Sequence, residues 1–471
     1  MLGPVPRRLV FLERAVAGRV NLIKIVNRRK KSFQLFCVLL AFVGAVPGLA
    51  GETPREIGVI DTAPNPVGPV TLDSAAREAV AWHPSVIEAV ERLSARAEGI
   101  KEASAGYRPQ IRAGTSAGYD SAARDGWRPR ANISATQMLY DFGKVSSTVA
   151  LAEAGTKVGR AQLLLAVDNL IRDTSYAIIE VQRTAALRDV ARNQLASIRS
   201  IDDLVGHRYR RGATTRSDAL QAQARVQAAE AAIQEIEAEH RRWNSNLAHL
   251  LGRQAAPQVD GGVPTWLPQA CDRGEPVWAD VPAVMRARAE RDEALAGLNR
   301  SKAEGMPTVS LGAGSSTALS DPFSARAEYN FGINVSSALY SGGASRARTR
   351  GATFALGAAD AAEAKTRNEV SRLLAEAQQQ VTSLIAVSET LASRETSMRE
   401  TGELYRLQYL EMGTRTLVDL LNAEQELHQV RFSIVNMRHD LRRLQVDCLF
   451  NAGAERDAFG LSGQTVKGVR L

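Results

Sequence analysis

The sequence lacks the short motifs that mark several common enzyme classes. It contains no phosphate-binding P-loop, no dinucleotide-binding glycine fingerprint and no HExxH zinc motif. Its six histidines show no spacing with cysteines or acids that would suit a metal ion. We therefore expect a protein that is not an enzyme and that binds no cofactor and no metal.

Cysteine is rare, with three in 471 residues. Cys37 falls in an apolar stretch near the start, which leaves Cys271 and Cys448 in the remainder of the chain. In an exported protein such a pair can form a disulfide, because the periplasm is oxidising. The alternative is two buried free thiols, and the sequence does not decide between them.

Proline is absent between Lys144 and Arg211, and apolar residues recur in this stretch at spacings of three and four. A later segment carries a heptad seam from Val370 to Tyr405. A sustained heptad pattern indicates coiled-coil packing. A helix of this length would extend about 100 Å, which a soluble domain of this mass does not need. Shorter helices are predicted at Leu72–Ala105 and Thr214–Leu251.

The first 50 residues resemble a sorting signal. Residues 1–32 hold nine Lys or Arg and one acidic residue, and residues 33–50 are uncharged and mostly apolar. A basic segment, an apolar segment and small residues ending at Ala50 predict a secretory signal peptide. The alternative is a membrane anchor, although Pro47 interrupts the short apolar run. These residues carry the whole formal net charge of +8, so the remainder is close to neutral and we expect no nucleic-acid partner.

Two stretches about 200 residues apart carry the same order of signals. A fixed internal repeat indicates one supersecondary unit built twice. Each unit is predicted to run as helix, two strands, long helix, glycine turn and returning helix. The matched positions are Pro84 and Pro282, Pro109 and Pro307, Tyr140 and Tyr340, Gly143 and Gly343, Gly212 and Gly413, and Asp218 and Asp419.

Each unit is predicted to hold two alternating strands: Gln110–Tyr119 with Arg130–Tyr140, and Thr308–Ser316 with Glu328–Tyr340. About ten residues with one apolar face suit a membrane-crossing β-strand, although a soluble hairpin would show the same alternation. Open strand edges are not tolerated in lipid, so four strands cannot form a barrel alone. If the strands cross a membrane, several protomers must share one barrel.

Together, the signal, the duplicated units and the glycine turns resemble the TolC family of outer-membrane channel-tunnels over roughly residues 70–455. The most specific match is Gly413–Glu424, which is similar to the family's signature at the second periplasmic helix turn. The strand-to-helix corners at Tyr140–Gly143 and Tyr340–Gly343 match as well. The resemblance implies an α+β membrane protein with an internal duplication. Three copies, with four strands per chain, would form one 12-stranded β-barrel in the outer membrane, in contact with its lipid, continued by a long coiled-coil α-helical barrel in the periplasm.

The resemblance also implies an iris of helical turns at the periplasmic end. By motif match, Asp419 would point a carboxylate into the pore, and Arg415 would tie the second hairpin to its neighbour near Ser217 and Asp218. The alternative for both aspartates is helix N-capping after a glycine turn. The turn residues themselves are Gly212, Gly413 and Thr414.

The sequence departs from the family pattern at two positions of this iris. Asn422 stands where the family carries a second pore carboxylate, which predicts a weaker ring of charge. Leu410 stands where the family carries a gate tyrosine, and Tyr409 is one position away. The hydrogen bond that such a tyrosine would make is therefore in doubt.

We expect the outer-membrane channel of a type I secretion system, a passive homotrimeric duct for an exported RTX-type toxin or adhesin. It would work with an inner-membrane ABC transporter and a periplasmic adaptor. Three segments of the carboxyl half resemble this branch, namely Thr414–Gln425, His428–Gln429 and Arg442–Cys448. The runner-up is the duct of a multidrug efflux pump, and an alternative of another class is a periplasmic coiled-coil adaptor.

We divide the chain into six segments. The signal peptide (1–50) and a flexible N-terminal segment (51–70) precede the first helix–strand–strand–helix–helix repeat (71–252). An inter-repeat linker (253–280), the second repeat (281–450) and a C-terminal tail (451–471) follow.

Overall fold

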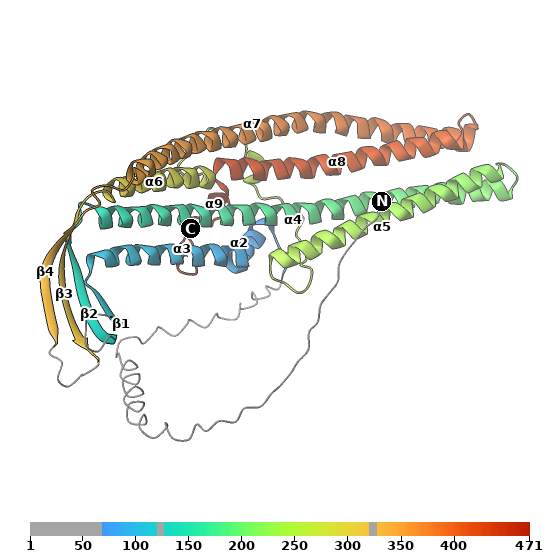
Figure 1. Ribbon diagram of the computed structural model, residues 1–471. Helices are drawn as coiled ribbons and strands as arrows, with labels where there is room; N and C mark the ends of the chain where they lie inside the picture. Colours follow the sequence, from blue (N-terminus) through green and yellow to red (C-terminus); the bar gives the residue numbers. More distant parts are fainter. Residues whose placement is uncertain (1–67, 120–126, 320–326) are drawn as a thin grey trace, which may run out of the picture. The chain divides into compact units, whose positions relative to one another are not determined.

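The computed structural model describes residues 68–119, 127–319 and 327–471, so the predicted signal peptide and most of the segment 51–70 lie outside the described residues. The described chain runs twice through helix, two strands, long helix and returning helix (Figure 1). The first unit consists of α2 (Leu72–Trp82), α3 (Pro84–Ser104), a 3-10 turn (Ala105–Tyr107), β1 (Gln110–Tyr119), β2 (Trp127–Tyr140), α4 (Lys144–Arg210) and α5 (Arg216–Leu250). The second consists of α6 (Pro282–Ala303), β3 (Thr308–Ala318), β4 (Glu328–Ser336), α7 (Ala344–Leu407), a π-helical turn (Gln408–Met412) and α8 (Leu417–Ala452).

The predicted helix at Leu72–Ala105 is wrong in one respect, because it is broken into α2 and α3. His83 adopts an extended conformation (φ −64°, ψ 134°) and Pro84 follows as the first residue of α3. The proline ring disfavours the helical conformation at the preceding residue, whereas the first helical position needs no N–H. Thr71 and Ser74 form a capping box at the start of α2.

The four strands form one antiparallel sheet in the order β1-β2-β3-β4. The β2–β3 pairing joins the two repeats, and β1 and β4 are the edges of the sheet. The strand predicted at Gln110–Tyr119 is confirmed, but the one predicted to reach Tyr340 ends at Ser336. Ser336 pairs with Thr308, the first residue of β3. Pro307 precedes Thr308 and has no N–H to donate, so the hydrogen-bond ladder between β3 and β4 stops there.

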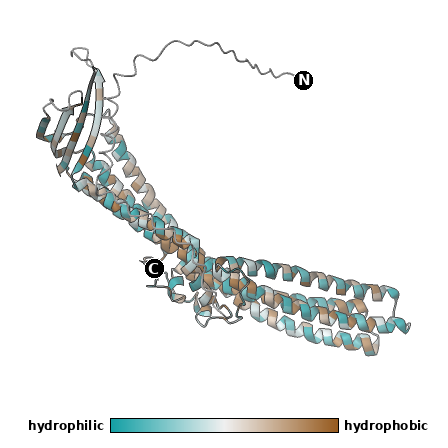
Figure 2. Cartoon of the chain, turned by 90° about the horizontal axis from the view of Figure 1, so that it is seen from below, coloured by the Kyte–Doolittle hydropathy of each residue, from teal (hydrophilic) through white to brown (hydrophobic). Residues whose placement is uncertain are grey.

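The two long helices differ in their neighbours. α4 has 67 residues and extends about 100 Å. It packs against α2, α3, α5, α6 and α8, whereas α7 packs against α6 and α8. Hydrophilic and hydrophobic residues are mixed along these helices (Figure 2), and no described helix is long and apolar enough to cross a membrane.

The main core lies where the middle of α4 meets α2, the end of α5 and the C-terminal residues. A short helix, α9 (Glu455–Ala458), and a hairpin of β5 (Thr465–Val466) and β6 (Val469–Arg470) follow α8. Phe459 and Leu461 are buried in this core together with Ile171 and Ile178 of α4. The carbonyl of Phe459 also accepts a hydrogen bond from Arg77 Nε at 3.1 Å. The C-terminal segment is thus packed against the first repeat.

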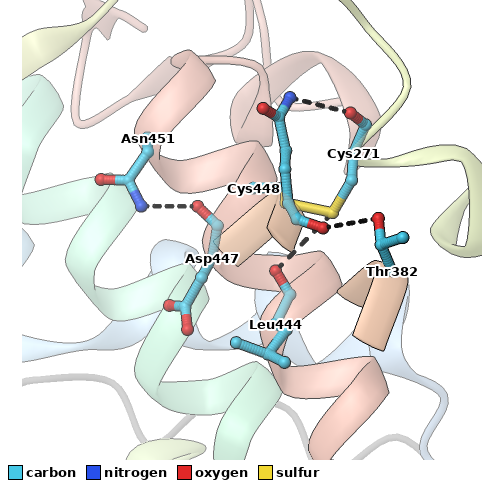
Figure 3. The surroundings of a disulfide bond; sticks show 7 residues. Cys271, Thr382, Leu444, Asp447, Cys448 and Asn451 are labelled. Atoms are coloured by element: carbon cyan, nitrogen blue, oxygen red, sulfur yellow. Dashed lines mark hydrogen bonds between the residues drawn. A yellow bond between two sulfur atoms is a disulfide. The ribbon is translucent and has the colours of Figure 1, made fainter. Parts of the chain in front are cut away.

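A disulfide joins Cys271 of the linker to Cys448 of α8, with the Cα atoms 5.2 Å apart (Figure 3). Both cysteines are buried, and they share an apolar cluster with Leu374, Ala377 and Val381 of α7. The side chain of Gln378 on α7 donates to the carbonyl of Cys271 at 3.1 Å. The bond therefore lies at the junction of the linker, α7 and α8.

Candidate functional site

The two turns at which the long helices end are built alike. Gly212 and Gly413 both have positive φ, +71° and +60°, a conformation that favours glycine. In the first turn, Asp218 accepts the Thr215 N–H at 3.2 Å and donates its own N–H to the Thr215 hydroxyl at 3.1 Å. In the second, Asp419 and Thr416 exchange the same two hydrogen bonds, both at 3.2 Å. Each aspartate therefore closes a capping box at the start of a returning helix.

These hydrogen bonds shift the acidity of both carboxyl groups. The Thr416 hydroxyl, which donates to Asp419 at 2.9 Å, lowers the pKa of Asp419 below its ordinary value. The Thr214 hydroxyl, which donates to Asp218 at 2.6 Å, lowers the pKa of Asp218 in the same way. Both groups are thus ionised at neutral pH and bring two fixed negative charges to the turns.

The other predicted residues of the iris lie on exposed positions of the same turns. Arg415 donates to Gln408 at 3.1 Å, and its guanidinium lies 4.3 Å from the centre of the Tyr405 ring. Within one chain it is thus held by its own hairpin and not by Ser217 or Asp218, so that contact stays a prediction. Ser217, Asn422 and Thr414 are exposed.

A contact between the two hairpins was missed by the sequence analysis. The side chain of Tyr409 is only 6 % exposed. The guanidinium of Arg208, on α4, lies 4.9 Å from the Tyr409 ring and donates to the Tyr409 carbonyl at 3.3 Å. Tyr409 belongs to the π-helical turn Gln408–Met412, and such a turn carries an extra residue that rotates the side chains after it.

Apolar side chains surround this contact. Leu417, Leu420 and Leu421 of α8 form one cluster with Ile201 and Val205 of α4. Burial of a leucine or isoleucine contributes roughly 1.5–3 kcal/mol. The two hairpins of one chain are therefore joined near their turns mainly by apolar packing.

The two strand-to-helix corners have similar backbone conformations but differ in their side chains. Gly143 and Gly343 both have positive φ, +93° and +84°, just before α4 and α7. At the first corner, Asp141 is buried and accepts the N–H groups of Gly143 at 3.0 Å and Val145 at 2.6 Å. Ser341 takes the place of Asp141 at the second corner, and Tyr340 lies outside the sheet and is 89 % exposed. The first corner is thus fixed more firmly.

We expected no serine-hydrolase motif in this sequence, but one segment matches its spacing. Gly114–Gly118 reads GTSAG, the GxSxG spacing of serine hydrolases. That motif requires a sharp strand-to-helix turn, whereas Ser116 lies within β1, paired with Arg130 of β2. The match is therefore a short-pattern coincidence in an alternating strand.

The sequence analysis also missed a buried group of charges beneath the C-terminal segment. Arg456 donates to both carboxylate oxygens of Asp168 on α4, at 2.9 and 2.7 Å. Both Asp168 and the neighbouring Glu455 are fully buried, and neither carboxyl oxygen of Glu455 has a hydrogen-bond partner. Burial, together with the charge of Asp168, raises the pKa of Glu455 well above its ordinary value.

Comparison with known proteins shows what this architecture is. The family model described as outer membrane efflux protein matches residues 75–253 and 278–447, which together are most of the chain. The chain belongs to the outer membrane efflux protein family. The resemblance to TolC-type channels is confirmed.

Two curated relatives match most of the length of this chain. One is the outer membrane efflux protein BepC of Brucella suis, 23% identical over 360 residues, which are 73% of this chain and 76% of BepC. The other is the alkaline protease secretion protein AprF of Pseudomonas aeruginosa, 26% identical over 350 residues, 69% of this chain and 70% of AprF. Among solved structures, the outer membrane protein VceC of Vibrio cholerae has the same fold, with a TM-score of 0.65 at 19% identity over 81% of this chain and 96% of VceC.

Membership of this family settles the location and the broad kind of activity. The protein is an outer-membrane transport channel whose helical part extends into the periplasm. The family is one of passive channels rather than enzymes. The alternative of a periplasmic coiled-coil adaptor is therefore not supported. In the described part of the chain, no group of three His, Cys, Asp or Glu side chains is arranged to hold a metal ion.

Proposed function

We propose that three copies of this chain form one passive duct, with a shared β-barrel in the outer membrane and a helical barrel in the periplasm. The observation that carries the proposal is the four-stranded sheet, whose edge strands β1 and β4 are each paired on one side and, among the described residues, unpaired on the other. Unpaired backbone groups are too costly in lipid to leave exposed. Pairing β4 of one chain with β1 of the next closes twelve strands without an edge.

The side chains of β4 support a position in the membrane. Phe331, Ile333 and Val335 are 82%, 67% and 69% exposed in the single chain and alternate with Gly332 and Asn334. An apolar face toward lipid and a polar face toward the lumen is the pattern of membrane β-barrels.

We propose further that the duct serves a type I secretion system and exports a protein of the RTX toxin or adhesin type. An inner-membrane ABC transporter would supply the energy, and a periplasmic adaptor would connect it to the helical turns. The similarity to AprF, described as an alkaline protease secretion protein, supports a protein cargo. The second candidate is a drug-efflux duct, supported by the similarity to BepC, described as an outer membrane efflux protein.

Two experiments test these proposals separately. The protein purified in detergent should be a trimer by light scattering, and a monodisperse monomer with intact β-signal in circular dichroism would refute the shared barrel. Deletion of the gene should remove one or a few large proteins from the secreted proteome and leave drug sensitivity unchanged. Drug hypersensitivity with an unchanged secretome would favour efflux instead.

A further inference from the structure

A basic groove lies between α4, α5, α8 and the inter-repeat linker. It encloses about 620 Å³, a volume within the range of small-molecule sites. No acidic residue is among the described residues that line it. Its charged and titratable lining consists of Arg188, His240, Arg438, His439 and Arg442.

The three guanidinium groups have no anionic partner in the described part of the chain. Arg442 donates to the neutral side chain of Gln182 at 3.0 Å. The Nε–H of Arg188 is buried and has no hydrogen-bond partner. A buried donor without a partner costs roughly 1–3 kcal/mol, so a ligand that accepts this hydrogen bond would be stabilised.

Two of the acidic side chains near the groove are paired with other cations. Glu180 pairs with Arg183 at 2.6 Å and with Arg443 at 3.1 Å. Glu239 pairs with Arg183 at 2.7 Å. The carboxylate of Asp260 accepts the N–H of Gly262 at 3.2 Å. Glu180 and Glu239 are therefore not available to the groove, and the three guanidinium groups that line it form no ion pair within the described part of the chain.

The titration of the lining residues reflects this excess of positive charge. Burial, together with the charge of Arg438, lowers the pKa of Arg442. Burial and the nearby Arg442, Arg438 and Arg183 also lower the pKa of His439, whose Nδ1–H donates to the carbonyl of Val435 at 2.7 Å. Like charges that destabilise one another are the expected lining of a site for an anion.

We propose that this groove binds a small anionic ligand that carries two or more phosphate or carboxylate groups. The planar guanidinium fork suits both groups, because it donates two parallel hydrogen bonds to two oxygens. Arg188 lies on α4 and Arg438 and Arg442 on α8, so a bound anion would bridge the two hairpins of one chain. The site does not depend on whether the duct exports proteins or drugs.

Calorimetric titration of the full chain purified in detergent tests the site. Pyrophosphate and citrate are the two probes, and sodium chloride at matched ionic strength is the reference. We expect saturable binding of at least one probe. Arg438→Gln removes charge-assisted hydrogen bonds and should weaken binding by about tenfold or more. The matched control is Arg394→Gln, because Arg394 is exposed on α7, and it should leave binding unchanged.

Each outcome supports or overturns the proposal. Binding of pyrophosphate alone, or of citrate alone, supports it and identifies the ligand class. The absence of saturable binding of either probe would overturn it, as would binding that Arg438→Gln and Arg442→Gln leave unchanged. An acidic side chain of a second copy found in the groove of the assembled protein would also overturn it, because the groove would then be an interface.

Discussion

The two long helices, α4 and α7, occupy equivalent positions in the two repeats but differ in how much of their surface is buried. α4 buries 24 of its 67 residues, and α7 buries five of its 64. The buried residues of α4 include the polar Asp168 and Glu180, whereas apolar residues such as Phe354 and Ile385 of α7 are exposed. One copy of the unit thus forms the interior of the chain and the other its edge. The edge needs stabilisation from elsewhere, namely the disulfide and, in our proposal, a second chain.

The largest effect is expected from removing the disulfide. Its loss should destabilise the hairpin of α7 and α8 more than the hairpin of α4 and α5. In the chain-entropy model, closing a loop with a sequence separation of 177 contributes about 5 kcal/mol as an upper value. In the Cys271→Ser/Cys448→Ser variant, hydrogen exchange should accelerate in α7 and α8 and change little in α4 and α5. The control is thiol labelling of the denatured, unreduced parent protein, where full reaction of both cysteines would contradict the pairing.

A charge on the outer face of the sheet tests the membrane position of the edge strand. Ile333→Arg should destabilise the folded barrel by about 2–4 kcal/mol, because an arginine near the bilayer midplane is costly. Asn334→Arg, on the opposite face of β4, is the matched control and should change stability much less. Unfolding in lipid vesicles measures both variants. Equal effects would contradict the assignment of the two faces.

Substitution of the buried Glu455 tests whether water is excluded from the interior around α4. Its folded-state pKa is raised, so the native state holds a proton that the unfolded chain releases above about pH 4.3. Its contribution to stability is therefore greatest at low pH and falls as pH rises through the raised value. Glu455→Gln should stabilise the protein by about 1–3 kcal/mol at pH 8 and have little effect at pH 4. The measurement is denaturant unfolding at both pH values, and an equal effect at both would rule out a buried titrating acid.

The smallest effect is expected at the two equivalent aspartates of the turns. Both complete a capping box from the third helical position, so Asp218→Ala and Asp419→Ala should each cost about 1 kcal/mol of stability. Only Asp419→Ala should also lower cation selectivity and block by multivalent cations in planar bilayers, because a ring of carboxylates at a constriction selects for cations. If Asp419→Ala leaves cation selectivity unchanged, Asp419 has no role in the pore and serves only in the capping box of α8.

Arg415→Ala tests, in the same bilayers, the mechanical role in an iris that the family resemblance predicts for Arg415. Loss of its contacts should loosen the turns and raise conductance. The control is Arg216→Ala in the first turn, where no such role is predicted. Equal conductance of both variants would contradict a mechanical role for Arg415.

The repeat, the long helices and three of the four strand starts could be predicted because each rests on a local signal. Alternation marked Gln110–Tyr119, and glycine turns marked the ends of α4 and α7. The helix break at His83 was also within reach, because Pro84 carries a local backbone constraint.

The remaining features depend on contacts between distant segments. The contact between Arg208 and Tyr409 joins residues 201 positions apart and depends on an extra residue in a π-helical turn. Glu455 and Asp168 are ordinary acids in the sequence, and only the packing of the C-terminal segment on α4 removes them from water. The charge of the basic groove likewise appears only when α4 and α8 lie side by side.

The link between Cys271 and Cys448 has a consequence for biogenesis. The covalent ring that it closes contains β3, β4 and all of α7. The ring can form only after both cysteines have left the reducing cytoplasm, so oxidation follows translocation of nearly the whole second repeat. Once the ring is closed, the second strand pair would, in our proposal, enter the outer membrane as a tethered loop rather than as a free segment. Cells that lack a periplasmic thiol oxidase should therefore accumulate this channel in a form sensitive to proteases.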